Sequence, residues 1–406
     1  MLGGKHRHMP TDRSLDIPVP AQQAGAKTLA AIFAGESLLR SMNVTVIPLQ
    51  AYELLGNSQR VSIVATTVSC MVLLTTLLLP FMLRGVRRRW VYTLGIGLVM
   101  LAALLFANYT IGGQIGGAYL RGLGAAVMSV TLSLYIMDHI PRTDLTWSEP
   151  LRLAFSTVSW TIGPAAGAWV FTHYGPVWAQ MTVLGVGLVL LAGFWIARLV
   201  DPETLPPGNL SGFNPLSNAL AFIAQPRLRL AWFIAFARSC FWSGMFIYSP
   251  LFFVEGGLSK TTAGLLLSAS QIALPASLLF GRLAAFKGVR WVVALCFSAM
   301  ALLCLAAGLF GERRIVFAAS ALLLASFFST GLDGVGGIPF LRAVKPRQRR
   351  EMTSVYRTYI ECSDLVPGFI FMGLLLFFPT GFVFIVLSGL MLFMALLVWK
   401  YLPKSM

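Results

Sequence analysis

Twelve long apolar runs fill this chain of 406 residues, and they constrain its fold more than any single motif does. A helix that crosses a bilayer needs ~20 mostly apolar residues, and each run is close to that length. The period-two alternation of a membrane β-barrel is absent. The sequence therefore predicts an all-α polytopic membrane protein. The twelve expected transmembrane helices cover residues 28–51, 61–83, 90–110, 114–137, 153–174, 177–197, 230–253, 262–284, 291–310, 316–340, 353–378 and 381–399.

Landmarks of the first six runs recur in the second six, at a spacing of 202 or 203 residues. The spacing is half the chain length, and a duplicated six-helix unit of matching polarity is the architecture of transporters whose halves rock around a shared site. We therefore expect two pseudo-symmetric six-helix bundles. The matching positions are Pro48 with Pro250, Glu53 with Glu255, Gly85-Val86-Arg87 with Gly288-Val289-Arg290, and Pro164 with Pro367.

The repeat predicts a division into two bundles, one linker and two tails. Residues 199–229 form the longest loop, in which Leu216, Ala219, Leu220 and Ile223 share one face of a short amphipathic helix capped by Asn214. The expected segments are a disordered tail at 1–27, a first bundle at 28–198, the linker at 199–229, a second bundle at 230–399 and a tail at 400–406.

The net charge of +16 is distributed by side of the membrane. With the N-terminus in the cytoplasm, 23 of the 31 Lys and Arg residues fall on the cytoplasmic side, counting Arg282 at the end of its run, four in the outer loops and four well inside the runs. The positive-inside rule then predicts a multi-pass protein of the inner (plasma) membrane with both termini cytoplasmic. The basic surplus faces lipid headgroups, and no nucleic-acid partner is expected.

The sequence contains few residues in patterns that indicate an enzyme, a metal site or a cofactor site. The five cysteines all lie within apolar runs, without metal-ligand spacing, and His6 and His8 lie in the polar tail. Asp138-His139 is the best catalytic candidate, but it has no evident third partner, and no nucleotide-binding loop occurs. We expect no cofactor, no metal and no enzyme, although a polytopic membrane enzyme and a transporter-like sensor remain alternatives.

Eight carboxylate and arginine residues lie well inside the apolar runs, away from their ends. Each costs ~2.5–3.5 kcal/mol at the centre of a bilayer, so they are expected to face one another or water. Four are acidic and four are basic, which allows the charges to balance. The residues are Glu36, Arg40, Arg121, Arg238, Asp333, Arg357, Glu361 and Asp364.

The roles of these charges follow from their chemistry. A carboxyl group in a partly dry cavity can bind a proton from one side and release it to the other, with Glu36 and Asp333 preferred over Glu361 and Asp364. Arginine stays charged and so suits an anionic or zwitterionic solute. A fixed internal salt-bridge network is the alternative. The aromatic residue most expected at the site is Trp160, four residues before Pro164.

Three short motifs carry a family resemblance. The first is the Gly-x-Leu-Ala-Asp-Arg-x-Gly-Arg-Arg turn of the major facilitator superfamily, which is similar to two loops here, Gly85-Val86-Arg87 and Gly281 to Arg290 with Gly288. The second is the superfamily's buried-arginine motif, which resembles Arg121 and its small neighbours. The third is its Gly-Pro-x-x-Gly element, which resembles Gly163-Pro164-Ala165-Ala166-Gly167. The chain resembles that superfamily and, through the last element, its twelve-helix drug/proton antiporter branch. Both turns lack the family aspartate, with Met82 and Ala285 in its place.

The resemblance implies a monomeric secondary active transporter that moves a small organic molecule by alternating access, with export in exchange for protons preferred. It also implies that Glu36 and Arg238, which correspond at a spacing of 202, face each other from the first and seventh helices as an ion pair across the bundles. The kinks and gates would then involve Gly85, Arg87, Gly163, Pro164, Gly167, Gly281, Gly288, Arg290 and Pro367. An uptake symporter or uniporter remains the alternative.

Overall fold

The computed structural model describes residues 20–82, 86–139, 145–197, 215–311, 313–344 and 349–403, and its elements there are helices. In the described part of the chain, nine helical stretches are long and apolar enough to cross a membrane by length and composition. Every predicted span coincides with one helix or with consecutive shorter ones. The first half contains α1 (Pro20–Leu55), α2 (Ser58–Met82), α3 (Arg88–Ala107), α4 (Ile111–His139), α5 (Leu145–Tyr174) and α6 (Pro176–Ile196).

The second half repeats this series with more interruptions. It contains α8 (Pro226–Glu255), α9 (Lys260–Ile272), η1 (Leu274–Ala276), α10 (Ser277–Lys287), α11 (Val289–Phe310), α12 (Ile315–Val335), α13 (Ile338–Ala343), α14 (Arg349–Arg357), α15 (Tyr359–Leu374) and α16 (Gly381–Tyr401). Pro275 interrupts the eighth predicted span, and Gly336, Gly337 and Pro339 interrupt the tenth, because proline removes a helix hydrogen bond and glycine weakens the helix.

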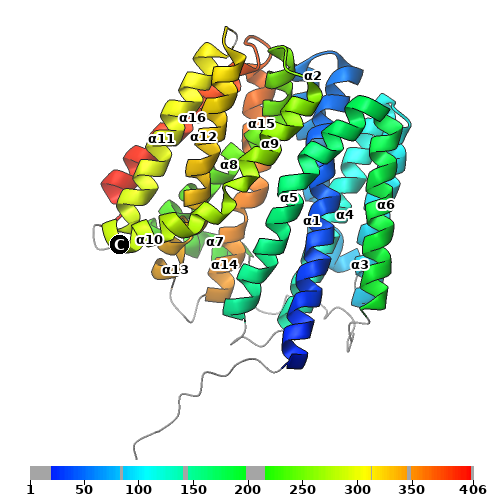
Figure 1. Cartoon of the computed structure of the whole chain (residues 1–406). Coiled ribbons are helices and arrows are strands. Elements are labelled where there is room, and N and C mark those ends of the chain that lie inside the picture. The colour runs from blue at the N-terminus through cyan, green and yellow to red at the C-terminus, as the bar shows by residue number, and fades with distance from the viewer. Residues whose placement is uncertain are drawn as a thin grey trace, which may run out of the picture.

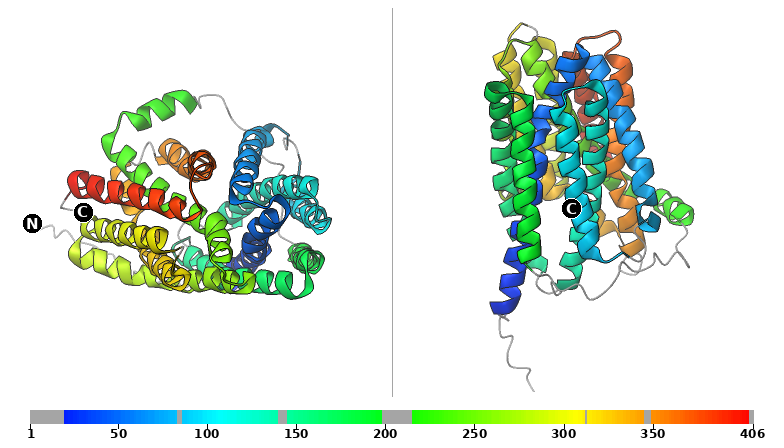
Figure 2. Two further views of the ribbon diagram at one scale, coloured as in Figure 1. Left: turned by 90° about the horizontal axis from the view of Figure 1, so that it is seen from above. Right: turned by 90° about the vertical axis from the view of Figure 1, so that its right-hand side faces the viewer.

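The helices run side by side, with the first half on one side of the molecule and the second half on the other (Figures 1 and 2). Each half has its own core: Leu39, Tyr92 and Met128 belong to that of the first, and Phe241, Phe297 and Phe384 to that of the second. We call the end where α1 begins the linker end, and the end where α1 turns into α2 the far end. The predicted linker helix is α7 (Pro215–Ile223), which lies at the linker end; Asn214 falls outside the described residues.

The two halves meet along repeat-related pairs of helices: α5 packs on α9, and α2 packs on α15. Gly264 allows the first pair to approach, since a Cβ atom there would lie 2.7 Å from the carbonyl oxygen of Pro164. Gly368 allows the second, since a Cβ atom there would lie 2.7 Å from Oγ1 of Thr66. Both contacts sit beside a repeated proline, Pro164 or Pro367, so the duplication seen in the sequence extends to the packing of the halves.

Candidate functional site

Two adjoining cavities lie between the halves, with volumes of about 410 Å³ and about 590 Å³. They share Arg40, Arg121 and Asp364 in their walls, and we call them together the central chamber. The larger cavity extends toward the linker end, where Val130 and Arg357 are exposed. Helices from both halves form the walls, so a solute in the chamber would contact both halves at once.

The charges in the central chamber come from opposite halves. Arg40 on α1 and Arg121 on α4 line it from the first half, and Glu361 and Asp364 line it from α15 in the second. Asp364 and Ser243 both line the smaller cavity. No ion pair within 4.0 Å joins these arginines to these carboxylates among the described residues. The chamber therefore offers positive and negative groups that a bound molecule can reach.

A series of aromatic rings runs along one side of the chamber and crosses between the halves. Trp160 on α5 stacks on Phe246 of α8 at 5.3 Å between ring centroids, and Phe246 stacks on Trp242 at 5.5 Å. Trp160 and Phe246 both line the smaller cavity. The sequence analysis singled out Trp160 but missed Phe246. The available signal was that Phe246 follows Trp242 by four residues, which places both rings on the same face of a helix.

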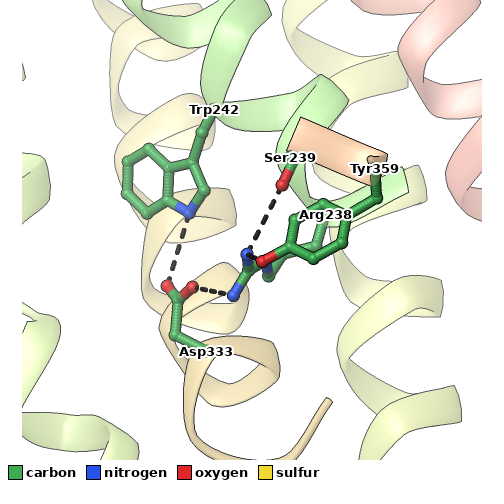
Figure 3. Close-up of polar contacts among 5 residues, drawn as sticks. All are labelled: Arg238, Ser239, Trp242, Asp333 and Tyr359. Atoms are coloured by element: carbon green, nitrogen blue, oxygen red, sulfur yellow. Dashed lines mark hydrogen bonds and ion pairs between the residues drawn. The ribbon is translucent and has the colours of Figure 1, made fainter. Parts of the chain in front are cut away.

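A second charged group lies within the second half alone (Figure 3). Arg238 on α8 forms an ion pair with Asp333 on α12, with Nη1 2.6 Å from Oδ1. Nε1 of Trp242 donates a hydrogen bond to Oδ2 of Asp333 at 3.3 Å, and Arg238 also donates to Ser239 and to the Tyr359 hydroxyl, each at 3.4 Å. Trp242 therefore links this group, through Phe246, to the central chamber.

The predicted ion pair between Glu36 and Arg238 is not formed in this conformation, where each residue has a different partner. Arg238 binds Asp333, while Glu36 pairs with Arg40, one helical turn away at 3.7 Å. Glu36 shares a face of α1 with Leu29, Ile32 and Leu39, which pack into the core of the first half, and it is 1% exposed. The helical phase that buries these apolar residues therefore turns Glu36 away from the second half.

The far end is held together by a repeat-related pair of contacts. Glu53, at the end of α1, forms an ion pair with Lys260, at the start of α9. Glu255, at the end of α8, accepts a hydrogen bond of 2.5 Å from Ser58, at the start of α2. The two glutamates are 202 residues apart, and so are their two partners. The sequence revealed the repeated glutamates, but not that each one crosses to the other half.

Two further polar contacts between the halves lie deeper. The hydroxyls of Ser62 and Tyr248 are 2.6 Å apart and buried. The backbone N–H of Ala165, next to Pro164, donates to Oγ of Ser268 at 2.9 Å. These contacts join the halves away from the linker end, whereas the exposed walls of the chamber lie toward it. The structure is thus closed at the far end and accessible from the linker end.

The Gly-Pro-x-x-Gly element packs tightly on both of its sides. A Cβ atom on Gly163 would clash with Oγ of Ser41, and one on Gly167 would clash with the backbone oxygen of Met42. These glycines hold α5 against α1, while Pro164 faces Gly264 of α9. Through this element, α5 packs against α1 of its own half and against α9 of the other half.

The predicted gate residues differ in their surroundings. Gly288 joins α10 to α11 with φ of +91°, a conformation that favours glycine, and the Arg290 guanidinium lies 4.8 Å from the ring centroid of Trp399. Gly281 has open space around it, Arg87 is exposed before α3, and Pro367 is buried inside α15. Gly85 lies outside the described residues.

The cysteines and histidines do not gather into a site in the described part of the chain. All five cysteines are free, and no group of three or more potential metal ligands occurs among the described residues. The ring of His173 pairs with the backbone oxygen of Trp169 at 2.9 Å. The side chains of Asp138 and His139, and the whole of His6 and His8, fall outside the description.

Comparison with known proteins agrees with this architecture. A sequence model described as Major Facilitator Superfamily matches residues 29–274, which is more than half of the chain. None of the curated proteins matches the sequence.

Solved transporters share the fold at low sequence identity. A POT family transporter in complex with 5-aminolevulinic acid is 12% identical with a TM-score of 0.71, covering 94% of this chain and 96% of its own. The peptide transporter POT in complex with sulfate is 12% identical with a TM-score of 0.74, covering 94% of each chain. The nucleoside transporter NupG is 12% identical with a TM-score of 0.68, covering 93% of this chain and 98% of its own. At this identity the likeness concerns the fold alone.

Proposed function

Because the chain belongs to the Major Facilitator Superfamily, we propose that this secondary transporter moves a small organic solute across the inner (plasma) membrane in exchange for protons. The observation that carries the proposal is the central chamber, where Arg40 and Arg121 of one half face Glu361 and Asp364 of the other. A molecule with both an anionic and a cationic group would satisfy both sets and draw the halves together. Such closure around a fixed site is how transporters of this architecture alternate access.

The orientation of the protein in the membrane follows from its basic residues. The segments predicted to be cytoplasmic carry 23 of the 31 Lys and Arg residues, and the described helix ends that adjoin them lie at the linker end. The positive-inside rule therefore favours a cytoplasmic linker end and cytoplasmic chain termini. On this assignment the chamber of the present conformation is accessible from the cytoplasm. The contacts of Glu53 with Lys260 and of Ser58 with Glu255 then form the outer gate.

Proton coupling is assigned to carboxylates that a solute and water can both reach. Glu361 and Asp364 line the chamber, so their protonation would change what the site can bind. Asp333 is a second candidate, because Trp242 and Phe246 connect it to the chamber. Glu36 is buried within one half, which makes a role in the internal structure of that half the better assignment for it.

Export is the proposed direction, supported by the Gly163-Pro164-Ala165-Ala166-Gly167 element and its place between the halves. Uptake by proton symport is the alternative, and vesicles distinguish the two. In inverted vesicles with an acidic lumen, adding a solute outside makes the lumen more alkaline under exchange, makes it more acidic under symport, and leaves its pH unchanged under uniport.

The solute itself can be found by thermal-shift screening of the purified chain at two pH values, using small zwitterions, anions and cations as separate sets. The proposal predicts that zwitterions stabilise the protein most, and that the effect is lost in Asp364→Asn but kept in Glu36→Gln. Stabilisation by cations alone, equal in both variants, would contradict the proposed site. Asp333→Asn, tested alongside, reports whether the second charged group takes part.

A further inference from the structure

A separate pocket lies at the linker end of the second half, away from the central chamber. Its volume is about 400 Å³, and it lies between the start of α8, the short helix α13 and the end of α16. Arg227 and Arg229 line it, together with apolar side chains. The apolar members of its wall include Pro226, Leu230, Phe233, Pro339, Leu397 and Leu402. The pocket thus combines two cations with a hydrocarbon surface.

The two arginines have no acidic partner among the residues that the structure describes. Both side chains are exposed, and within that part of the chain neither forms an ion pair. The first turn of α8 begins at Pro226, and the dipole of this helix start adds positive potential at the same place. This corner of the pocket is therefore suited to an anion from outside the described chain.

The position of the pocket along the helices matches the level of lipid headgroups. Trp399 and Tyr401 near the end of α16 are 54% and 59% exposed, and such aromatic side chains gather at membrane–water interfaces. Phe233, two turns into α8, is 44% exposed and continues the wall toward the membrane interior. The cations thus lie at the interface and the apolar wall extends from them into the bilayer.

We propose that this pocket binds an anionic phospholipid, with its headgroup phosphate on Arg227 and Arg229 and an acyl chain along Phe233. A basic pocket between helices beside apolar surface is the recognised chemistry of such lipid sites. The site is separate from the central chamber, with which it shares no lining residue. Leu228 and Phe340, which neighbour the wall residues in sequence, pack with Phe222 of α7, so an occupying lipid would brace the linker helix.

The test uses the full-length purified protein in detergent, titrated with phosphatidylglycerol and followed by native mass spectrometry and thermal stability. Phosphatidylcholine and inorganic phosphate serve as probes that lack the net charge or the chains. We expect retained phosphatidylglycerol and a rise in melting temperature, with neither effect from the other two. Removing both cations in Arg227→Gln with Arg229→Gln is expected to weaken lipid binding roughly 30-fold.

Matched variants keep the result interpretable. Arg282→Gln with Lys287→Gln removes two exposed charges of α10 that lie outside the pocket and should leave binding unchanged. Leu397→Trp should fill the pocket and block binding with the cations intact, whereas Leu396→Trp on the neighbouring exposed surface should not. Equal loss in both arginine and α10 variants, equal stabilisation by inorganic phosphate, or unaltered binding in Leu397→Trp would each overturn the proposal.

Discussion

The two charged groups of this protein differ in where their members come from. In the central chamber, Arg40 and Arg121 belong to one half and Asp364 to the other, and they face a cavity. Arg238 and Asp333 belong to the same half and already form an ion pair of 2.6 Å. Charges that are paired within one rigid body can stabilise it in every conformation. Arg40 also pairs with Glu36 of its own helix, but Arg121 and Asp364 lie on different bodies and form no ion pair among the described residues. Such charges are available to a solute and would change their environment under the proposed movement of the halves.

The largest expected effect is the loss of the second half's contribution to the chamber. Asp364→Asn removes the negative group that faces Arg40 and Arg121, and we expect solute affinity to fall roughly 100-fold, or about 3 kcal/mol. Binding can be measured by calorimetry and transport by flux into proteoliposomes. Asp364→Glu is the control and should retain partial activity. If Asp364→Asn bound and transported normally, the chamber would not be the solute site.

The paired group should respond in the opposite way, through stability. Arg238→Gln leaves Asp333 without its partner, and because both side chains are about a quarter exposed we expect a loss of about 2 kcal/mol in the free energy of unfolding. The double variant Arg238→Gln with Asp333→Asn should recover much of that loss, as measured by thermal unfolding. Additive losses in the double variant would show that the pair does not act as a unit.

A smaller effect is expected at the aromatic rings that join the two groups. Phe246→Ala removes the ring between Trp160 and Trp242, at a cost of about 1 kcal/mol in solute binding for an apolar or aromatic solute. Phe246→Leu, which keeps apolar volume without the ring, separates stacking from packing. Calorimetry on the three proteins measures the difference, and an unchanged affinity in Phe246→Ala would remove the rings from the site.

Much of the fold was accessible from sequence, because the physics of the bilayer demands long apolar runs. Each predicted span coincides with one helix or with consecutive shorter ones. The 202-residue repeat pointed to related positions such as Glu53 and Glu255, which make related contacts. Arg121 and Asp364 drew attention in the sequence for a similar reason, since charge inside an apolar run needs a cavity or a partner.

Partner choice was not accessible in the same way. The symmetric spacing of Glu36 and Arg238 suggested a pair. Whether a side chain faces the core of its own half or the other half depends on its position around the helix axis, and a shift of one residue changes that direction. Glu36 falls on the buried face of α1, and Arg238 finds Asp333 on α12, 95 residues later in the chain. A single sequence contains no signal for such a distant contact, and the breaks at Pro275 and Gly336 shift helix phase further.

The most direct test of whether the two halves move against each other measures two spin-label distances, one at each end of the molecule, in two doubly labelled variants of the protein. Labels at Arg60 and Arg313 report the far end, and labels at Ser133 and Ile360 report the linker end, in a background without native cysteines. The ion pair of Glu53 with Lys260 is replaced by repulsion in Lys260→Glu, which should open the far end. We predict a longer far-end distance together with a shorter linker-end distance. A far end that opens while the linker-end distance stays unchanged would contradict the account of two bodies rocking around a shared chamber.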